Sequence, residues 1–180
     1  MRLRRLQDET DGRLAIRWRA FPLRPVPDPT ASFQGTYREA AWRRCHDLSA
    51  DAGVTFRMWQ RSDFPATSMP ALEAAKCASL QGDAAWAALH LRLYQAFFAD
   101  GVNIGEPAEV AGVVRGVPEV DFAAFLRDYE AGRGRQPVLD DYQTAVREHG
   151  VRAIPTVVLD DGRRIVGAVP LAEYRRVLAA

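Results

Sequence analysis

The chain has 180 residues, of which 48% are hydrophobic and 26% are charged. This composition is typical of a globular domain and excludes a disordered or low-complexity chain. The formal net charge of +1 gives no electrostatic case for binding nucleic acid or a membrane surface. The basic stretch at residues 1–6 is not followed by an apolar run, so we expect neither a signal peptide nor a transmembrane segment, and a cytoplasmic protein is the default.

The N-terminal part is predicted to combine a helix with a strand. Residues 2–10 place two leucines at helical spacing among strong helix formers, which predicts an amphipathic helix. Apolar and polar residues alternate over 14–21, which predicts a strand. Four prolines between residues 22 and 29 then predict an extended connector.

The middle of the chain is predicted to be helical. Apolar residues at helical spacing, bounded by glycine, serine or proline, predict helices over 35–52, 69–81, 83–99, 107–115, 121–131 and 138–149. Ser68 is the expected N-cap of the second of these helices. Asp140 and Asp141 are expected to lie exposed at the start of the helix over 138–149, and a catalytic role for them is not expected.

The most informative stretch covers residues 150–168. Gly150 suits the left-handed position after a helix. Pro155 can begin a strand but cannot sit inside one, and the apolar residues 157–159, two of them β-branched valines, are typical of a buried strand. The sequence Asp-Asp-Gly at 160–162 predicts a tight turn that returns the chain as a hairpin, after which a final helix begins.

Four stretches are informative when taken together: Gly-Val-Arg-Ala-Ile-Pro-Thr at 150–156, Trp-Arg-Ala-Phe-Pro-Leu-Arg-Pro at 18–25, Pro-Ala-Leu-Glu-Ala-Ala-Lys at 70–76 and Leu-Tyr-Gln-Ala-Phe-Phe-Ala-Asp-Gly-Val-Asn-Ile at 93–104. In their order along the chain they resemble thioredoxin-fold proteins of the DsbA family and are most similar to its cytoplasmic FrnE-like branch. The resemblance implies an α/β fold with a thioredoxin-like, DsbA-type mixed sheet. It implies one domain over 1–180, with an inserted helical subdomain at about 33–136.

The resemblance also implies a substrate-binding wall. In the DsbA family the proline of this motif is cis and faces the redox centre. By resemblance, Ile154, Pro155 and Thr156 would line the groove that receives the substrate.

The resemblance implies a first strand and, directly after it, a Cys-x-x-Cys motif at the N-terminus of the first helix. These 180 residues contain neither, so we expect no catalytic residue in this chain and a sheet whose first strand is missing. In the family that strand lies between the segments at 14–21 and 156–160. Its burial is worth roughly 5–9 kcal/mol, a large part of the roughly 5–15 kcal/mol that stabilise a domain. We therefore expect a marginally stable chain unless its sheet rearranges or a partner strand fills the gap. The hypothesis that follows is a truncated gene model, which an in-frame stop codon directly upstream would contradict.

Cys45 and Cys77 do not replace the missing motif. Each lies inside a predicted amphipathic helix, far from the other in sequence, and we expect both to be small core or half-buried residues. His46, His90 and His149 show no metal-ligand spacing, so we expect no metal site and no cofactor.

Three functional hypotheses follow. The first is a DsbA-family thiol–disulfide oxidoreductase-like protein that is redox-deficient because the dithiol is absent. The second is an enzyme similar to kappa-class glutathione transferases and 2-hydroxychromene-2-carboxylate isomerases, in which glutathione would pair beside Ile154. The third is a non-catalytic thioredoxin-like module that binds extended peptide there. The expected partners are a thiol-containing or unfolded polypeptide, or glutathione; nucleic acid and membranes are not expected, and a homodimer stays open.

Overall fold

The computed structural model describes residues 2–11, 13–49 and 54–178 of the chain. The chain forms two compact units, one made of both chain ends, 1–21 and 141–180, and the other of residues 22–140. Both strands belong to the first unit, and the boundary falls inside one helix. A single domain with a helical insertion at about 33–136 stays a prediction.

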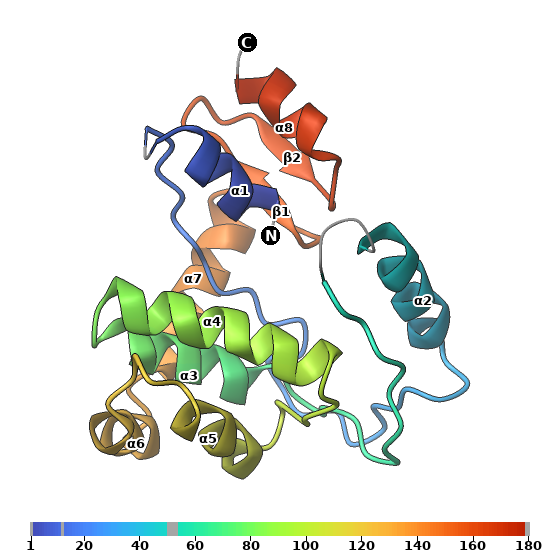
Figure 1. Ribbon diagram of the computed structural model, residues 1–180, viewed down its shortest axis with the longest axis vertical. Coiled ribbons are helices and arrows are strands. Elements are labelled where there is room, and N and C mark those ends of the chain that lie inside the picture. Colours follow the sequence, from blue (N-terminus) through green and yellow to red (C-terminus); the bar gives the residue numbers. More distant parts are fainter. Residues whose placement is uncertain (1, 12, 50–53, 179–180) are drawn as a thin grey trace. The chain divides into compact units, whose positions relative to one another are not determined.

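The unit formed by residues 22–140 is helical (Figure 1). It contains α2 (Tyr37–Ser49), α3 (Met69–Ser79), α4 (Asp83–Phe98), α5 (Pro107–Arg115), α6 (Phe122–Glu130) and the start of α7 (Arg135–Arg147). Each helix predicted in this region is confirmed, with small shifts at the ends; residues 50–52 of the first lie outside the described residues. The largest shift is at α7, which begins at Arg135 and not at residue 138. Pro137 is tolerated there because the N–H groups in the first turn of a helix have no acceptor within the helix.

Small side chains let the helices of this unit approach closely. Helix α3 packs against α4, α5 and α6. Its buried residues are mostly small: Met69, Pro70, Ala71, Ala74, Ala75, Cys77 and Ala78. Gly134, directly before α7, lies so close to α3 that a Cβ atom there would clash with the backbone carbonyl of Glu73. This position therefore requires glycine.

The proline-rich connector is fastened to the start of α3 within the same unit. The backbone N–H of Ser68 donates to the carbonyl of Arg24 at 3.0 Å, and the Ser68 hydroxyl accepts from the N–H of Arg24 at 3.1 Å. Ser68 is the N-cap residue of α3, as predicted, but its hydroxyl makes no hydrogen bond to the first turn. The hydroxyl instead satisfies a connector N–H that would otherwise lack a partner.

The unit formed by the chain ends is built on a hairpin (Figure 1). It contains α1 (Arg2–Glu9), β1 (Thr156–Val158), β2 (Arg164–Val166) and α8 (Leu171–Leu178). The strands are antiparallel, and helix α1 packs against α8. A cluster of buried residues from α1, β2 and α8 forms the core of this unit: Leu6, Ile165 and Tyr174. One face of the hairpin is thereby covered, and the residues that alternate with Ile165 point to the other face.

The predicted strand over 14–21 is wrong, and with it the predicted mixed sheet. Residues 13–21 form no regular element, and the sheet of the described chain consists of β1 and β2 alone. A strand exists only where a neighbour completes its ladder of N–H and C=O groups. No described segment supplies that ladder, so the alternating sequence has no strand to join.

Asp141 in α7 holds this segment instead. Its carboxylate accepts from Arg19 Nη1 at 3.0 Å and from the backbone N–H of Ala20 at 2.7 Å. The expectation that Asp141 is exposed is wrong, because the residue is buried. Beside it, the rings of Phe21 and Tyr142 pack edge to face with centroids 5.0 Å apart. Side chains of α7 thus replace a strand ladder as the support of residues 19–21.

Candidate functional site

A left-handed turn leads from α7 toward the motif that contains the proline. Gly150 has a φ of 58°, in the region that glycine favours and that commonly follows a helix. The N–H of Val151 donates to the carbonyl of Ala145 in α7 at 2.8 Å. The predicted helix stop at Gly150 is therefore confirmed, and it directs the chain toward β1.

The three predicted substrate-binding residues form the entry to β1. The peptide bond between Ile154 and Pro155 is cis. The Thr156 hydroxyl donates to the carbonyl of Ala153 at 2.6 Å and so closes a short turn around them. The side chain of Ile154 is 42% exposed, which is unusual for a large apolar residue beside a strand.

The hydrogen bonds at the two ends of the hairpin determine which of its cross-strand residue pairs are hydrogen-bonded. The carbonyl of Pro155 accepts from the N–H of Gly167 at 2.8 Å. At the turn, the N–H of Leu159 donates to the carbonyl of Arg163 at 2.9 Å. Hydrogen-bonded and non-bonded pairs alternate along antiparallel strands. The pair of Val157 and Ile165, midway between these two bonds, is therefore also hydrogen-bonded.

This alternation determines which backbone N–H and C=O groups of β1 face away from β2. Val157 is a bonded position facing β2, whereas Thr156 and Val158 direct their N–H and C=O groups away from β2. Within residues 2–11, 13–49 and 54–178, no third strand runs along that edge. Thr156 and Val158 therefore present an open strand edge directly after Pro155, and such an edge can pair with an added strand.

A pocket of about 320 Å³ lies beside this edge. Its lining includes Arg152, Ala153, Thr156, Arg164 and Val166. The pocket lies wholly in the unit that contains the hairpin. Sequence inspection missed the two arginines, because the fold of the hairpin brings them together.

The two cysteines lie in different helices of the other unit and form no disulfide. Cys77 is fully buried in α3, as expected, and burial raises the pKa of its thiol to about 11. Cys45 in α2 is exposed, so the expectation of a core or half-buried residue is wrong for it. The thiolate is the nucleophile in disulfide exchange, and Cys77 is held as the thiol.

The part of the chain that the structure describes contains no group of His, Cys, Asp or Glu side chains that could hold a metal ion. His90 is half-buried, and its ring stacks on Trp86 with centroids 4.6 Å apart, as befits a histidine on an apolar helix. No helix in the described residues has the length and apolar character that crossing a membrane requires.

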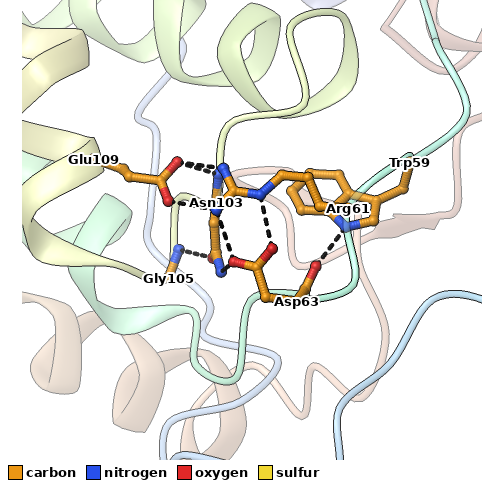
Figure 2. A network of polar contacts seen from close by, with 6 residues as sticks. All are labelled: Trp59, Arg61, Asp63, Asn103, Gly105 and Glu109. Atoms are coloured by element: carbon orange, nitrogen blue, oxygen red, sulfur yellow. Dashed lines mark hydrogen bonds and ion pairs between the residues drawn. The ribbon is translucent and has the colours of Figure 1, made fainter.

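A polar network in the helical unit was not foreseen from the sequence (Figure 2). The guanidinium of Arg61 donates to both carboxylate oxygens of Glu109, each at 2.7 Å, and to both oxygens of Asp63 at 2.7 and 2.8 Å. Buried Asn103 donates through Nδ2 to Asp63 at 2.8 Å and through its N–H to Glu109 at 3.0 Å. Its Oδ1 accepts from the N–H of Gly105 at 3.0 Å.

In this network one guanidinium pairs with two carboxylates. Hydrogen bonds from Arg61 hold the pKa values of Asp63 and Glu109 below their ordinary values, and the carboxylates raise the pKa of Arg61 in return. Each charged group finds its partner inside the network, so the network fastens the loop around residue 61 to the turn between α4 and α5. Its members are far apart in sequence, and no short motif could have revealed it.

The chain matches the family model of the DSBA-like thioredoxin domain over residues 1–179. It belongs to this family.

A solved structure agrees with this assignment. The crystal structure of a Nitrosomonas europaea protein, provisionally described as a protein disulfide isomerase, has a TM-score of 0.74 to this chain at 16% sequence identity. The match covers 99% of this chain and 86% of that chain. At this identity the likeness shows the fold. None of the curated proteins compared with the chain matches it.

The expected α/β, DsbA-like thioredoxin fold is therefore confirmed, although the described sheet is a small antiparallel pair of strands and not the expected mixed sheet. The family makes it a protein of the thiol–disulfide oxidoreductase-like kind. In this DsbA-like chain, the motif at Ile154–Thr156 leads into a strand with an open edge.

Proposed function

We propose that this DsbA-like chain binds extended polypeptide along the open edge of β1 and performs no dithiol exchange with its own two cysteines. The observation that carries the proposal is the outward direction of the N–H and C=O groups of Thr156 and Val158. An extended peptide can pair with these groups as an added strand, which supplies affinity through main-chain hydrogen bonds without a sequence requirement.

The surroundings of the edge support a polypeptide ligand. The exposed side chain of Ile154 and that of Val166, which is 58% exposed, offer apolar contacts to alternate side chains of such a strand. An unfolded or thiol-containing polypeptide fits this surface, in keeping with the family. We place the chain in the FrnE-like branch on its sequence motifs and propose the cytoplasm as its compartment.

The cysteines support the second half of the proposal. A Cys-x-x-Cys pair works because a helix N-terminus stabilises the attacking thiolate and a neighbouring cysteine resolves the mixed disulfide. Cys77 is buried as a thiol inside α3, and Cys45 lies within α2 without a second cysteine beside it in sequence. Neither meets these requirements.

Two assays test the proposal. Fluorescence anisotropy with a labelled, reduced and alkylated unfolded polypeptide is expected to show saturable binding, which excess unlabelled polypeptide reverses. Insulin reduction by the chain with dithiothreitol is expected to proceed at the rate of dithiothreitol alone. Failure to bind the polypeptide contradicts the first half of the proposal. Insulin turnover that Cys45→Ser or Cys77→Ser abolishes contradicts the second half.

Glutathione and a second copy of the chain are competing occupants of the same edge. Retention on glutathione resin, with elution by free glutathione and no binding of polypeptide, would favour the transferase or isomerase hypothesis. A homodimer detected by sedimentation that dissociates as unfolded polypeptide is added would show that both ligands use this edge.

A further inference from the structure

The pocket beside β1 carries positive charge that no described carboxylate neutralises. Arg152 and Arg164 line it, and its lining contains no acidic residue. Neighbouring arginines of the same unit are paired, Arg163 with Asp161 at 2.6 Å and Arg176 with Glu173 at 2.6 Å. Within the described residues, neither Arg152 nor Arg164 has a carboxylate at ion-pair distance. Two unpaired guanidinium groups in one pocket favour an anionic ligand.

The guanidinium of Arg164 is held in place before any ligand arrives. Its Nη1 donates to the carbonyl of His149 at 2.8 Å and lies 3.4 Å from that of Gly150, at the end of α7. A guanidinium has five N–H donors, and in the described chain the Nε and Nη2 groups of Arg164 remain without acceptors. A fixed donor with free N–H groups binds a carboxylate at a low entropic cost.

The pocket adjoins the edge where the polypeptide is proposed to bind. Arg164 pairs with Val158 and Val166 pairs with Thr156, so these four side chains share one face of the hairpin. A strand added along β1 would direct every second side chain to this same face. The side chain next to Thr156 would lie at the pocket, because Thr156 lines it.

We propose that this site prefers extended polypeptides with an acidic side chain at the position facing the pocket, where Arg152 and Arg164 bind the carboxylate. The inference rests on the proposed function, because it requires a polypeptide along β1. A guanidinium pairs with a carboxylate through two parallel hydrogen bonds, whereas an amide of the same shape forms weaker bonds and a lysine is repelled. The open edge thereby acquires a selectivity that main-chain pairing alone lacks.

The test uses three labelled peptides of eight residues that are identical and neutral except for a central Glu, Gln or Lys. In low salt, we expect the Glu peptide to bind the wild-type chain about tenfold more tightly than the Gln peptide and the Lys peptide to bind most weakly. We expect the preference to shrink in about 0.5 M salt, which screens exposed charges.

Substitution of single arginines shows which side chains cause the preference for Glu. Arg152 makes no hydrogen bond or ion pair within the described residues and lies outside α7, so Arg152→Gln removes the charge without disturbing that helix, and we expect it to reduce the preference for Glu several-fold. Arg164→Gln is expected to do the same, with thermal unfolding as the check on its fold. Arg163→Gln is the matched control, since Arg163 is paired with Asp161 and lies outside this pocket, and it should retain the preference.

The outcomes separate the two proposals. Equal affinities for the three peptides, or a preference for Glu that survives both pocket variants, would overturn the acidic selectivity and leave polypeptide binding standing. A chain that binds none of the peptides overturns polypeptide binding and the selectivity that depends on it.

Discussion

The carbonyl of Pro155 accepts a hydrogen bond from the N–H of Gly167 at 2.8 Å, and this bond marks the register of the hairpin. As a consequence, two adjacent valines have opposite backbone roles. Val157 bonds to β2 through its N–H, whereas the N–H of Val158 points to the open edge. Substitution of one valine or the other therefore tests the open edge separately from the pairing of β1 with β2.

We expect Val158→Pro to reduce binding of unfolded polypeptide at least about tenfold, because it removes an outward N–H and adds a ring at the edge. Proline is tolerated on edge strands where the N–H faces outward, so the hairpin ladder stays intact. Val157→Pro is the matched control: it breaks the ladder and should lower the free energy of unfolding by about 3 kcal/mol. Anisotropy and urea denaturation measure the two effects, and wild-type binding by a folded Val158→Pro variant would contradict the proposed edge.

Replacement of Asp141 tests how the segment before residue 22 is held. Asp141→Ala removes a buried carboxylate that accepts from Arg19 and from the N–H of Ala20, and leaves that N–H without its acceptor. We expect the free energy of unfolding to fall by about 2–3 kcal/mol, measured by urea denaturation. Asp140→Ala changes the exposed neighbour and should cost less than about 0.5 kcal/mol. Equal effects of the two substitutions would refute the anchoring role.

The Arg61 network predicts a pH dependence with a definite sign. The pKa values of Asp63 and Glu109 are lower in the folded chain than their ordinary values, chiefly because Arg61 donates to both carboxylates. Their stabilising contribution is thus complete above about pH 5 and is lost as the pH falls through the folded values. Because the three side chains are partly exposed, the contribution is modest and sensitive to salt.

We therefore expect Arg61→Met to make unfolding free energies, measured in urea between about pH 6 and pH 3, less dependent on pH than those of the wild type. Arg57→Met removes an exposed arginine four residues earlier in the same loop and serves as the control. An unchanged pH slope in Arg61→Met would show that the network does not contribute to acid stability.

Replacement by alanine should change the stability of the chain in opposite directions at two glycines of the helical unit. Gly134→Ala places a methyl group against the backbone of Glu73, which cannot move aside, and should destabilise the chain by about 2–3 kcal/mol. Gly112 lies inside α5 with open space around its Cα, so Gly112→Ala should stabilise it by about 0.5–1 kcal/mol. Thermal unfolding compares them directly, and similar melting temperatures for the two variants would contradict the close approach.

Local sequence patterns predicted most elements of this chain. The helices of residues 22–140 and the hairpin after Pro155 have their causes within a few residues: apolar spacing, prolines at helix starts, and glycines with positive φ such as Gly150 and Gly162. The proline motif also pointed to the correct family, because its residues are contiguous in sequence. Such features need no distant partner, and a short window of sequence contains their whole physical basis.

The failures at residues 14–21 and at Asp141 share one cause, which is dependence on a distant partner. Residues 14–21 alternate like a strand but have no described neighbour to complete a ladder, and Asp141 supports them instead. The open edge of β1 and the meeting of Arg152 with Arg164 likewise follow from hairpin register and chain path. By itself, the sequence determined the helices, the hairpin after Pro155 and the family to which the chain belongs. Only the tertiary structure decided which backbone groups stay unpaired and which charges share a pocket, because both depend on contacts between residues far apart in the chain.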